Sequence, residues 1–327
     1  MDTPRSLCQR VALVATLFAL ICSQASLAQN AETLILFDPD ALETPESIVF
    51  DRHDNAYITL AFTGEIRRVA PDLTQTSLAF LPIGAPCGDA TTVALGLAID
   101  FFDRLYVAIT ACDPANSGIW KVDTEDGSIE LLANAPSATV WNGIDAHRGF
   151  IYAADTFDGL VWRIPLRGGS PEIWADDPLL KRPPESMFPG PNGLQYFRGK
   201  IFVANSSTGD IVGIPIRPGG GAGQAFVKAT LPFPQGCDEF TFDIRGRIYC
   251  TTDPFNTIVR LNRDGSSDIL LTADDLLDGP TSVAFGRRGG NRKNLYITNA
   301  AFPIFTTTFR PSLMRLRVDT PGAPFEF

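Results

Sequence analysis

The chain has 327 residues, which is enough for one large β domain or two average domains. Its 23 phenylalanines, 28 glycines and 25 prolines favour many short strands and turns over long helices. The net charge of −10 argues against a nucleic-acid partner, which would require a basic face.

The first 28 residues have the composition of a secretory signal peptide. Arg5 and Arg10 precede an apolar run over 11–22, and residues 26–28, SLA, form a small-x-small cleavage pattern. The run is short for a membrane span, so we expect cleavage before Gln29; an uncleaved anchor is the alternative. No later segment is apolar enough to cross a bilayer. The sequence therefore predicts a secreted or periplasmic protein that makes no membrane contact once the signal is removed.

The rest of the chain repeats a unit of roughly 46 to 50 residues, a period typical of a four-stranded propeller blade. A first strand at 32–38 precedes the repeats, and each repeat then has strands A to D, separated by turn residues. Copies one to three place these strands at 47–51, 55–61, 65–69 and 76–81, then at 96–100, 104–110, 119–122 and 128–133, then at 143–146, 150–154, 160–164 and 171–175. Copies four and five place them at 193–197, 200–204, 210–216 and 224–230, then at 239–243, 247–251, 257–261 and 268–272. Copy six has only three strands, at 282–285, 294–298 and 313–318.

The missing fourth strand of copy six is matched by the spare strand at the N-terminus. If Thr33 to Phe37 completes the last blade, the array closes into a ring and no terminal blade needs a cap. We therefore predict an all-β fold, a six-bladed β-propeller of four-stranded blades, as one domain over residues 29–327. A non-closing array of the same sheets is the alternative.

Propeller geometry sorts the loops between two faces. The A strands line the central channel, the D-to-A and B-to-C loops open on one face, and the A-to-B turns open on the other. His53 and His147 fall in A-to-B turns, so we expect solvated turn residues there and no catalytic histidine pair at the A-strand starts.

Three long loops, at 82–93, 180–191 and 299–312, lie on the face of the A-strand starts. This face also carries aromatic residues that would wall an apolar substrate pocket or pack on one another. They are Trp141, Phe188, Phe233, Phe302, Phe305 and Phe309.

The residue just before strand A occupies the same phase in every copy and converges at one end of the channel. The six occupants are Glu46, Leu95, Asn142, Asn192, Asp238 and Thr281. Two carboxylates and two amide oxygens are hard ligands, which favour a divalent cation and above all Ca²⁺. Without an ion, Glu46 and Asp238 would repel each other. The alternative is that these side chains only cap turns.

Four cysteines remain after removal of the signal peptide. Cys87 and Cys112 fall in loops on one face and form the favoured disulfide. Cys237 and Cys250 lie on adjacent strands out of register, so a second bridge or two buried thiols are both open. Asn205 begins a glycosylation sequon, which applies if the host glycosylates exported proteins.

Short segments around the candidate ligands resemble a known family. They are PES at 45–47, WNGI at 141–144, GPNGL at 190–194 and CDEF at 237–240. These are similar to the metal-site segments of the senescence marker protein, gluconolactonase and luciferin-regenerating enzyme family, to which diisopropylfluorophosphatases are related. The resemblance implies that Glu46, Asn142, Asn192 and Asp238 bind a divalent cation, usually calcium. It also implies that Asp238 is the general base or nucleophile.

Two positions depart from that family's pattern. Sugar lactonases often have arginine where this chain has Val140, and a glycine usually stands where this chain has Glu239. We therefore expect metal-dependent hydrolysis of an apolar lactone, ester or organophosphate as the small-molecule substrate. A non-hydrolytic synthase or cyclase and a calcium-stabilised binding propeller are the alternatives.

Overall fold

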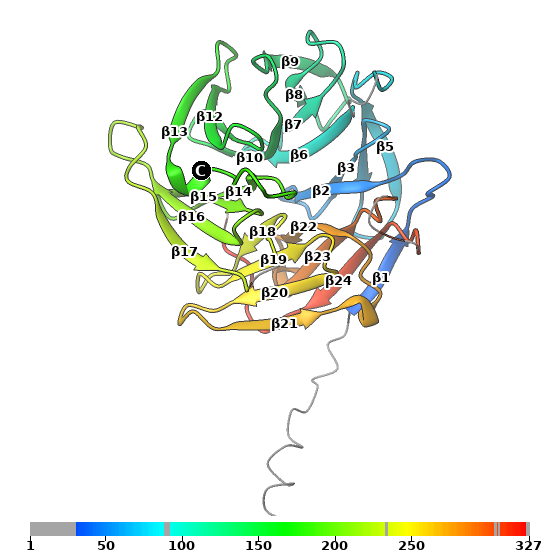
Figure 1. Ribbon diagram of the computed structural model, residues 1–327. Coiled ribbons are helices and arrows are strands. Elements are labelled where there is room, and N and C mark those ends of the chain that lie inside the picture. The colour runs from blue at the N-terminus through cyan, green and yellow to red at the C-terminus, as the bar shows by residue number, and fades with distance from the viewer. Residues whose placement is uncertain (1–30, 88–91, 233–234, 304–305, 307, 325–327) are drawn as a thin grey trace, which may run out of the picture. The chain divides into compact units, whose positions relative to one another are not determined.

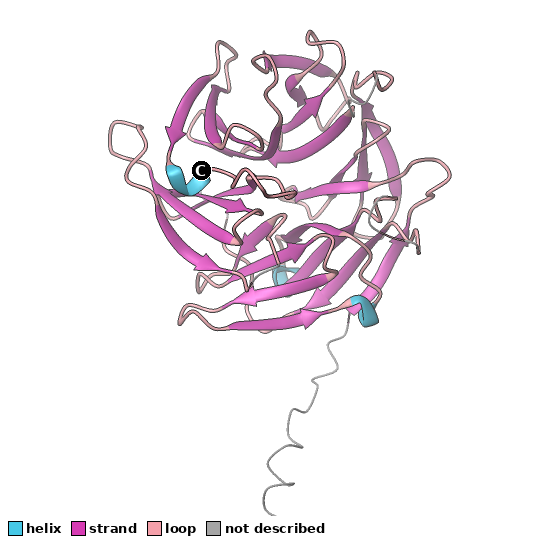
Figure 2. Ribbon diagram, in the orientation of Figure 1, coloured by secondary structure: helices cyan, strands magenta, loops and turns pink. Residues whose placement is uncertain are grey.

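A computed structural model describes residues 31–87, 92–232, 235–303, 306 and 308–324. The predicted signal peptide, Phe233 and Phe305 lie outside these ranges. The described part consists of 24 strands and three short 3₁₀ turns (Figure 2), at Pro178–Leu180, Ala273–Asp275 and Gly289–Lys293. None of its helices has the length and apolar character needed to cross a membrane.

The strands form six antiparallel four-stranded sheets, which are the blades (Figure 1). Blades one to three comprise β2 Pro45–Phe50, β3 Ala56–Leu60, β4 Glu65–Val69, β5 Gln75–Phe80; β6 Val93–Ile99, β7 Leu105–Thr110, β8 Gly118–Val122, β9 Ile129–Asn134; and β10 Trp141–His147, β11 Phe150–Asp155, β12 Leu160–Pro165, β13 Glu172–Asp176. Blades four and five comprise β14 Pro191–Phe197, β15 Lys200–Asn205, β16 Asp210–Pro215, β17 Phe226–Thr230; and β18 Phe240–Phe242, β19 Ile248–Thr252, β20 Thr257–Leu261, β21 Ser267–Leu271. The sixth has β22 Pro280–Phe285, β23 Asn294–Asn299, β24 Ser312–Arg317 and β1 Ala31–Leu36.

The ring closes as predicted. Strand β1 pairs antiparallel with β24, with Thr33 opposite Met314 and Ile35 opposite Leu313. The first strand of each blade contacts the first strands of the two neighbouring blades, in the order β2, β6, β10, β14, β18, β22 and back to β2. These six strands therefore surround the central channel, and the fourth strands lie at the outside (Figure 1).

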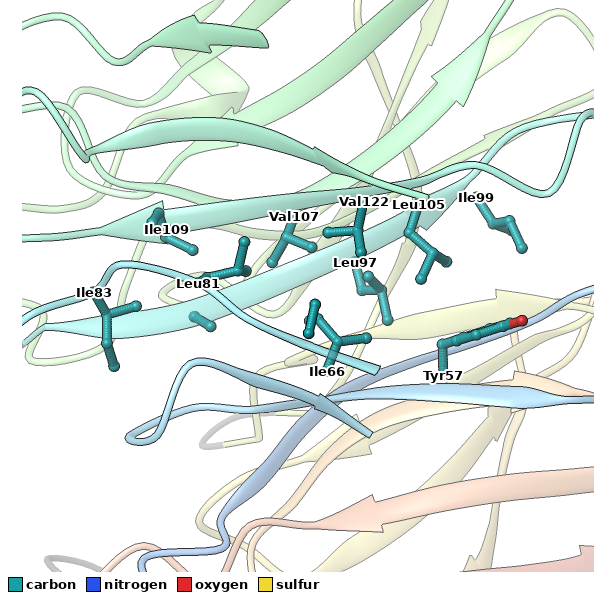
Figure 3. Close-up of a cluster of buried hydrophobic side chains, with 12 residues drawn as sticks. Tyr57, Ile66, Leu81, Ile83, Leu97, Ile99, Leu105, Val107, Ile109 and Val122 are labelled. Atoms are coloured by element: carbon teal, nitrogen blue, oxygen red, sulfur yellow. The ribbon is translucent and has the colours of Figure 1, made fainter. Parts of the chain in front are cut away.

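The core lies between neighbouring blades. Between blades one and two, Tyr57 and Ile66 face Leu97 and Val107, and all four are almost fully buried (Figure 3). Alternation along each strand sends one set of side chains to the preceding blade and the other to the next. Each blade is therefore stabilised by its neighbours, and the A strands hold a fixed position around the channel.

The disulfide prediction is confirmed for one pair. Cys87 and Cys112 are bonded, with their Cα atoms 5.8 Å apart. Cys237 and Cys250 are buried free thiols; burial raises the pKa of Cys237, and Cys250 lies close enough to raise it further.

Two predictions about single residues are wrong. His53 is exposed as expected, but His147 is buried at 3% exposure and its ring stacks on Tyr196 at 3.5 Å between centroids. Asn205 is fully buried, and its amide nitrogen donates to the carbonyls of Leu179 and Lys181. The folded chain therefore does not present Asn205 for glycosylation.

Candidate functional site

A β-bulge at the start of strand A positions three of the four candidate ligands. In blades one, three and four, two residues of strand A lie opposite one residue of strand B, and the extra pairs are 46–47, 142–143 and 192–193. A bulge breaks the alternation and re-aims the side chain that it contains. Asp238 precedes the short strand β18 and is fixed by its N–H, which donates to the carbonyl of Thr251.

Glycines bring the candidate residues close together. Blade two has a similar bulge at 95–96, and the bulges of blades two to four all end in glycine. A Cβ atom at each glycine would collide with the backbone carbonyl oxygen of the candidate residue in the next blade. The distances would be 2.1 Å from Gly96 to Asn142, 2.3 Å from Gly143 to Asn192 and 2.6 Å from Gly193 to Asp238. Gly193 also donates its N–H to the Asp238 carbonyl at 2.8 Å. These A strands can approach so closely only because the side chain is absent.

Buried threonine hydroxyls form hydrogen bonds with the backbone of the candidate positions. Thr298 of strand β23 donates to the carbonyl of Glu46 at 3.0 Å, and Thr281 donates to the same carbonyl at 2.7 Å. Thr59 donates to the carbonyl of Leu95 at 3.0 Å, and Thr251 donates to that of Thr281 at 2.8 Å. The backbone of the candidate positions is therefore held across the boundaries between blades.

The side-chain oxygens at this level are buried without matching donors. Glu46 is 8% exposed and Asn192 is 5% exposed, and within the described residues Glu46 Oε2 and Asn192 Oδ1 have no hydrogen-bond partner. Buried polar atoms are normally paired, so an unpaired pair of oxygens at one place needs an explanation. A hard cation would supply one, because it takes oxygen ligands.

The charges of the site lead to the same conclusion. Burial raises the pKa of Asp238 well above its usual range, and the negative charges of Glu46, Asp253 and Glu239 raise it further. A hydrogen bond with Asn192 opposes this rise. Burial also raises the pKa of Glu46 well above its usual range, with Glu239 and Asp253 adding to the effect. Several carboxylates that disfavour each other's ionised form are the electrostatic signature of a place for a positive charge.

In the described part of the chain, no three His, Cys, Asp or Glu side chains come close enough to hold an ion by themselves. The amide oxygens of Asn142 and Asn192 would therefore be needed to complete a ligand set with Glu46 and Asp238. Asn142 is half-buried at the start of β10, whose neighbour β14 carries Asn192.

The sequence places Asp253 near the end of a B strand, where we expected it to cap the B-to-C turn or to lie near a substrate. This residue follows strand β19, and its carboxylate interacts electrostatically with both Glu46 and Asp238. Its Oδ1 atom is buried and has no hydrogen-bond partner among the described residues. Burial raises the pKa of Asp253 to about 7, and the charge of Asp278 contributes.

The described members of the predicted aromatic set make separate contacts. Trp141 is 2% exposed and belongs to the core between blades two and three, where it lies 6.2 Å from Trp162, so it is not on an open pocket wall. Phe188 lies 5.8 Å from Phe255, and Phe302 lies 5.8 Å from Phe62. Phe309 is 44% exposed. Phe233 and Phe305 lie outside the described residues.

A cavity of about 500 Å³ lies in the other half of the channel, away from the candidate ligands. It is lined by the second halves of the six A strands, with Glu239 and Asp145 among the lining residues. Glu239 accepts hydrogen bonds from the hydroxyls of Ser47 and Ser282, and its pKa rises to about 7 because burial outweighs these bonds. Asp145 accepts from the N–H of Tyr196 at 2.7 Å, and burial raises its pKa to about 6.

Solved structures with this fold include three that bear on the site. A luciferin-regenerating enzyme is 15% identical over 90% of this chain and 98% of its own, with a TM-score of 0.66. A calcium-binding regucalcin from Agrobacterium tumefaciens is 16% identical over 86% of this chain and 92% of its own, with a TM-score of 0.65. A gluconolactonase from Xanthomonas campestris is 15% identical over 90% of this chain and 96% of its own, with a TM-score of 0.62.

These likenesses confirm the propeller fold that the repeats predicted. The chain is a six-bladed β-propeller of the architecture found in luciferin-regenerating enzyme, regucalcin and gluconolactonase. The sequence matches no family model, and a search of curated proteins gives no significant match. Since one fold supports many chemistries, the function must be argued from the site.

Proposed function

We propose that the protein is a metal-dependent hydrolase that acts on a lactone, ester or organophosphate with an apolar substituent. The observation that carries this proposal is the pair of buried, unpaired oxygens, Glu46 Oε2 and Asn192 Oδ1, beside Asp238 at the head of the channel. A gluconolactonase and a calcium-binding regucalcin among the structures with the same fold support it.

The residues present fit a divalent cation, and Ca²⁺ best. Glu46 and Asp238 supply two negative charges, and the amide oxygens of Asn142 and Asn192 are neutral hard ligands. Two cysteines lie nearby, but Cys237 is fully buried with a raised pKa, so a thiolate ligand for zinc is disfavoured. A bound calcium ion would polarise the carbonyl or phosphoryl oxygen of the substrate.

Asp238 carries the reactive carboxylate in this proposal. It accepts the proton from an attacking water, or it attacks the substrate directly. Its burial makes the ionised form unfavourable in the absence of a counter-charge. Glu46 and the two asparagines hold the site, and the hydroxyls of Thr281 and Thr298 fix the Glu46 backbone.

The substrate preference follows from the loops on the same face. Phe188 and Phe255 form one aromatic contact there, and Phe62 and Phe302 form another. Where sugar lactonases often have arginine, Val140 offers no positive charge to a polar substrate. An apolar ring substituent is therefore favoured over a sugar acid.

The test is a series of γ- and δ-lactones with alkyl chains of increasing length, with a carboxylic ester and an organophosphate for comparison. Hydrolysis is followed by proton release, with calcium and with a chelator. We expect turnover that needs calcium and rises with chain length, and a loss of about 10²- to 10⁴-fold in Asp238→Asn. The control is Asp264→Asn, which removes an exposed carboxylate on a distant turn. Full turnover by Asp238→Asn on every accepted substrate would refute the role of Asp238.

A calcium-stabilised binding propeller is the second candidate. The observation that favours it is the position of the cavity of about 500 Å³, which lies in the half of the channel away from Asp238. Calcium binding without hydrolysis of any member of the substrate series would select this function over the first.

We further propose that the enzyme is exported and works outside the cytoplasm. The basic and apolar leader of the sequence and the Cys87–Cys112 disulfide support this location. The mass of the protein recovered from culture medium or periplasm tests it, with residues 1–28 expected to be absent.

A further inference from the structure

In four blades, the last residue of strand B is a buried polar residue whose side chain is hydrogen-bonded. Asp155, Asn205 and Asn299 end their B strands, and each is fully buried and hydrogen-bonded. Asp155 accepts from Trp162 Nε1, for example, and Asn299 donates to Ser312 Oγ. In blade five this position is Thr252, because Thr252 pairs with Thr257 as Asp155 pairs with Leu160.

Thr252 alone caps the turn between strands B and C of blade five. Its hydroxyl accepts from the N–H of Thr257 at 3.1 Å and lies 2.6 Å from the Thr257 hydroxyl. Asp253 comes one residue later and has no such capping task. Its acidic side chain therefore needs another explanation.

Asp253 follows strand β19, which pairs with the segment that carries Asp238. Six buried side-chain atoms lack a hydrogen-bond partner in the described residues, and three of them are Glu46 Oε2, Asn192 Oδ1 and Asp253 Oδ1. Asp238 donates its N–H to the carbonyl of Thr251, two residues before Asp253, so Asp253 stands at the end of strand B beside Asp238. Gly279 leaves room for it, since a Cβ there would lie 3.2 Å from Asp253 Oδ1.

We propose that Asp253 is a third carboxylate of the candidate cation site and binds the ion through an intervening water molecule. Contact through water is required because the three carboxylates do not come close enough to hold an ion alone. The inference rests on the proposed function. It adds that the site carries three negative charges, so it binds hard cations tightly and prefers a trivalent ion over calcium.

The experiment compares calcium and terbium affinities of the full mature chain and two variants, measured by calorimetry and by terbium luminescence. Removing a partner from the outer sphere of an ion typically costs 10- to 100-fold in affinity, so Asp253→Asn should weaken binding by that amount. The loss should be larger for terbium than for calcium, because the interaction scales with ionic charge.

Asp278→Asn is the matched control. Asp278 is also a buried carboxylate near Asp253, but its Oδ2 accepts from Thr308 Oγ1 at 2.5 Å and from the Arg310 N–H at 2.8 Å. This variant should unfold at a lower temperature and keep most of its cation affinity. Equal losses of affinity in both variants would mean a general charge effect and would overturn the proposal.

A second measurement separates binding from folding. In chelator, Asp253→Asn should melt at or above the temperature of the wild type, since the change removes a buried charge that has no hydrogen-bond partner at Oδ1. A lower melting temperature with unchanged affinity would make Asp253 a structural residue. If the wild type hydrolyses a substrate with calcium and Asp253→Asn binds calcium equally well, only the role of Asp253 falls. If the wild type binds neither ion, the proposed metal site falls with it.

Discussion

The close approach of the A strands gives a sharp prediction at Gly193. In Gly193→Ala, the new Cβ would lie 2.6 Å from the carbonyl oxygen of Asp238 and 2.7 Å from the Cα of Glu239. Both contacts are with backbone atoms, so a side-chain rotation cannot relieve them. Strands β14 and β18 must move apart, and the hydrogen bond from Gly193 N–H to Asp238 must lengthen.

The magnitude follows from the cost of overpacking. Inserting a methyl group into a well-packed region typically costs about 1–3 kcal/mol. In a domain of this size, that corresponds to a fall in melting temperature of roughly 2 to 5 °C. Because Asp238 and Asn192 flank the collision, we also expect calcium affinity to fall by about 10- to 100-fold.

Gly219→Ala is the control, because it is the same substitution at a position with nothing within 4 Å of the new methyl group and no positive φ. Thermal unfolding and calcium titration are measured for both variants. If Gly193→Ala matched Gly219→Ala in both measurements, the argument that the glycines set the spacing of the candidate ligands would be refuted.

Three further predictions concern stability. Thr298→Val removes the hydroxyl bonded to the Glu46 carbonyl and should cost about 1–3 kcal/mol in urea unfolding, with weaker calcium binding; an unchanged midpoint would contradict it. Cys87→Ser opens a loop with a sequence separation of 25 and should cost about 3–4 kcal/mol, measured without reductant; reducing agent should then have no further effect. In chelator, the melting temperature should fall as pH rises from 5 to 8. Burial raises the pKa values of Glu239 and Asp253 to about 7 in the folded protein. Over this pH range the folded state therefore loses protons that the unfolded state has already lost, and its stability falls. Calcium should stabilise most at pH 8, and equal stabilisation at pH 5 would contradict this reasoning.

The blades were predictable because each strand carries its own signal. Short runs bounded by turn residues predict β4 and β20 at the bounds that the structure shows, Glu65–Val69 and Thr257–Leu261. Ring closure was also predictable, since one strand was missing at the C-terminal end and one was spare at the N-terminal end. These features depend on local pattern and on counting, and both are present in a single sequence.

The details of the site were harder to predict from the sequence, because they depend on the register between distant strands. A bulge at 192–193 changes which way Asn192 points, and only the following glycine hints at it. A shift of one residue separates Thr252, which ends β19, from Asp253, and pattern alone does not show which of the two caps the turn. The burial of His147 likewise depends on the ring of Tyr196 in the next blade.

Glu239 determines how the channel can be used. At the same phase the other A strands carry only small residues, which are Ser47, Gly96, Gly143, Gly193 and Ser282. They leave space at this level for one large side chain, and the Glu239 carboxylate takes it, bonded to the hydroxyls of Ser47 and Ser282. Glu239 directly follows the candidate ligand Asp238 and also lines the cavity of about 500 Å³, so it stands where the candidate site meets the cavity. In the proposed hydrolase, a substrate for Asp238 would therefore enter from the face of the long loops, and those loops, not the cavity, would select it.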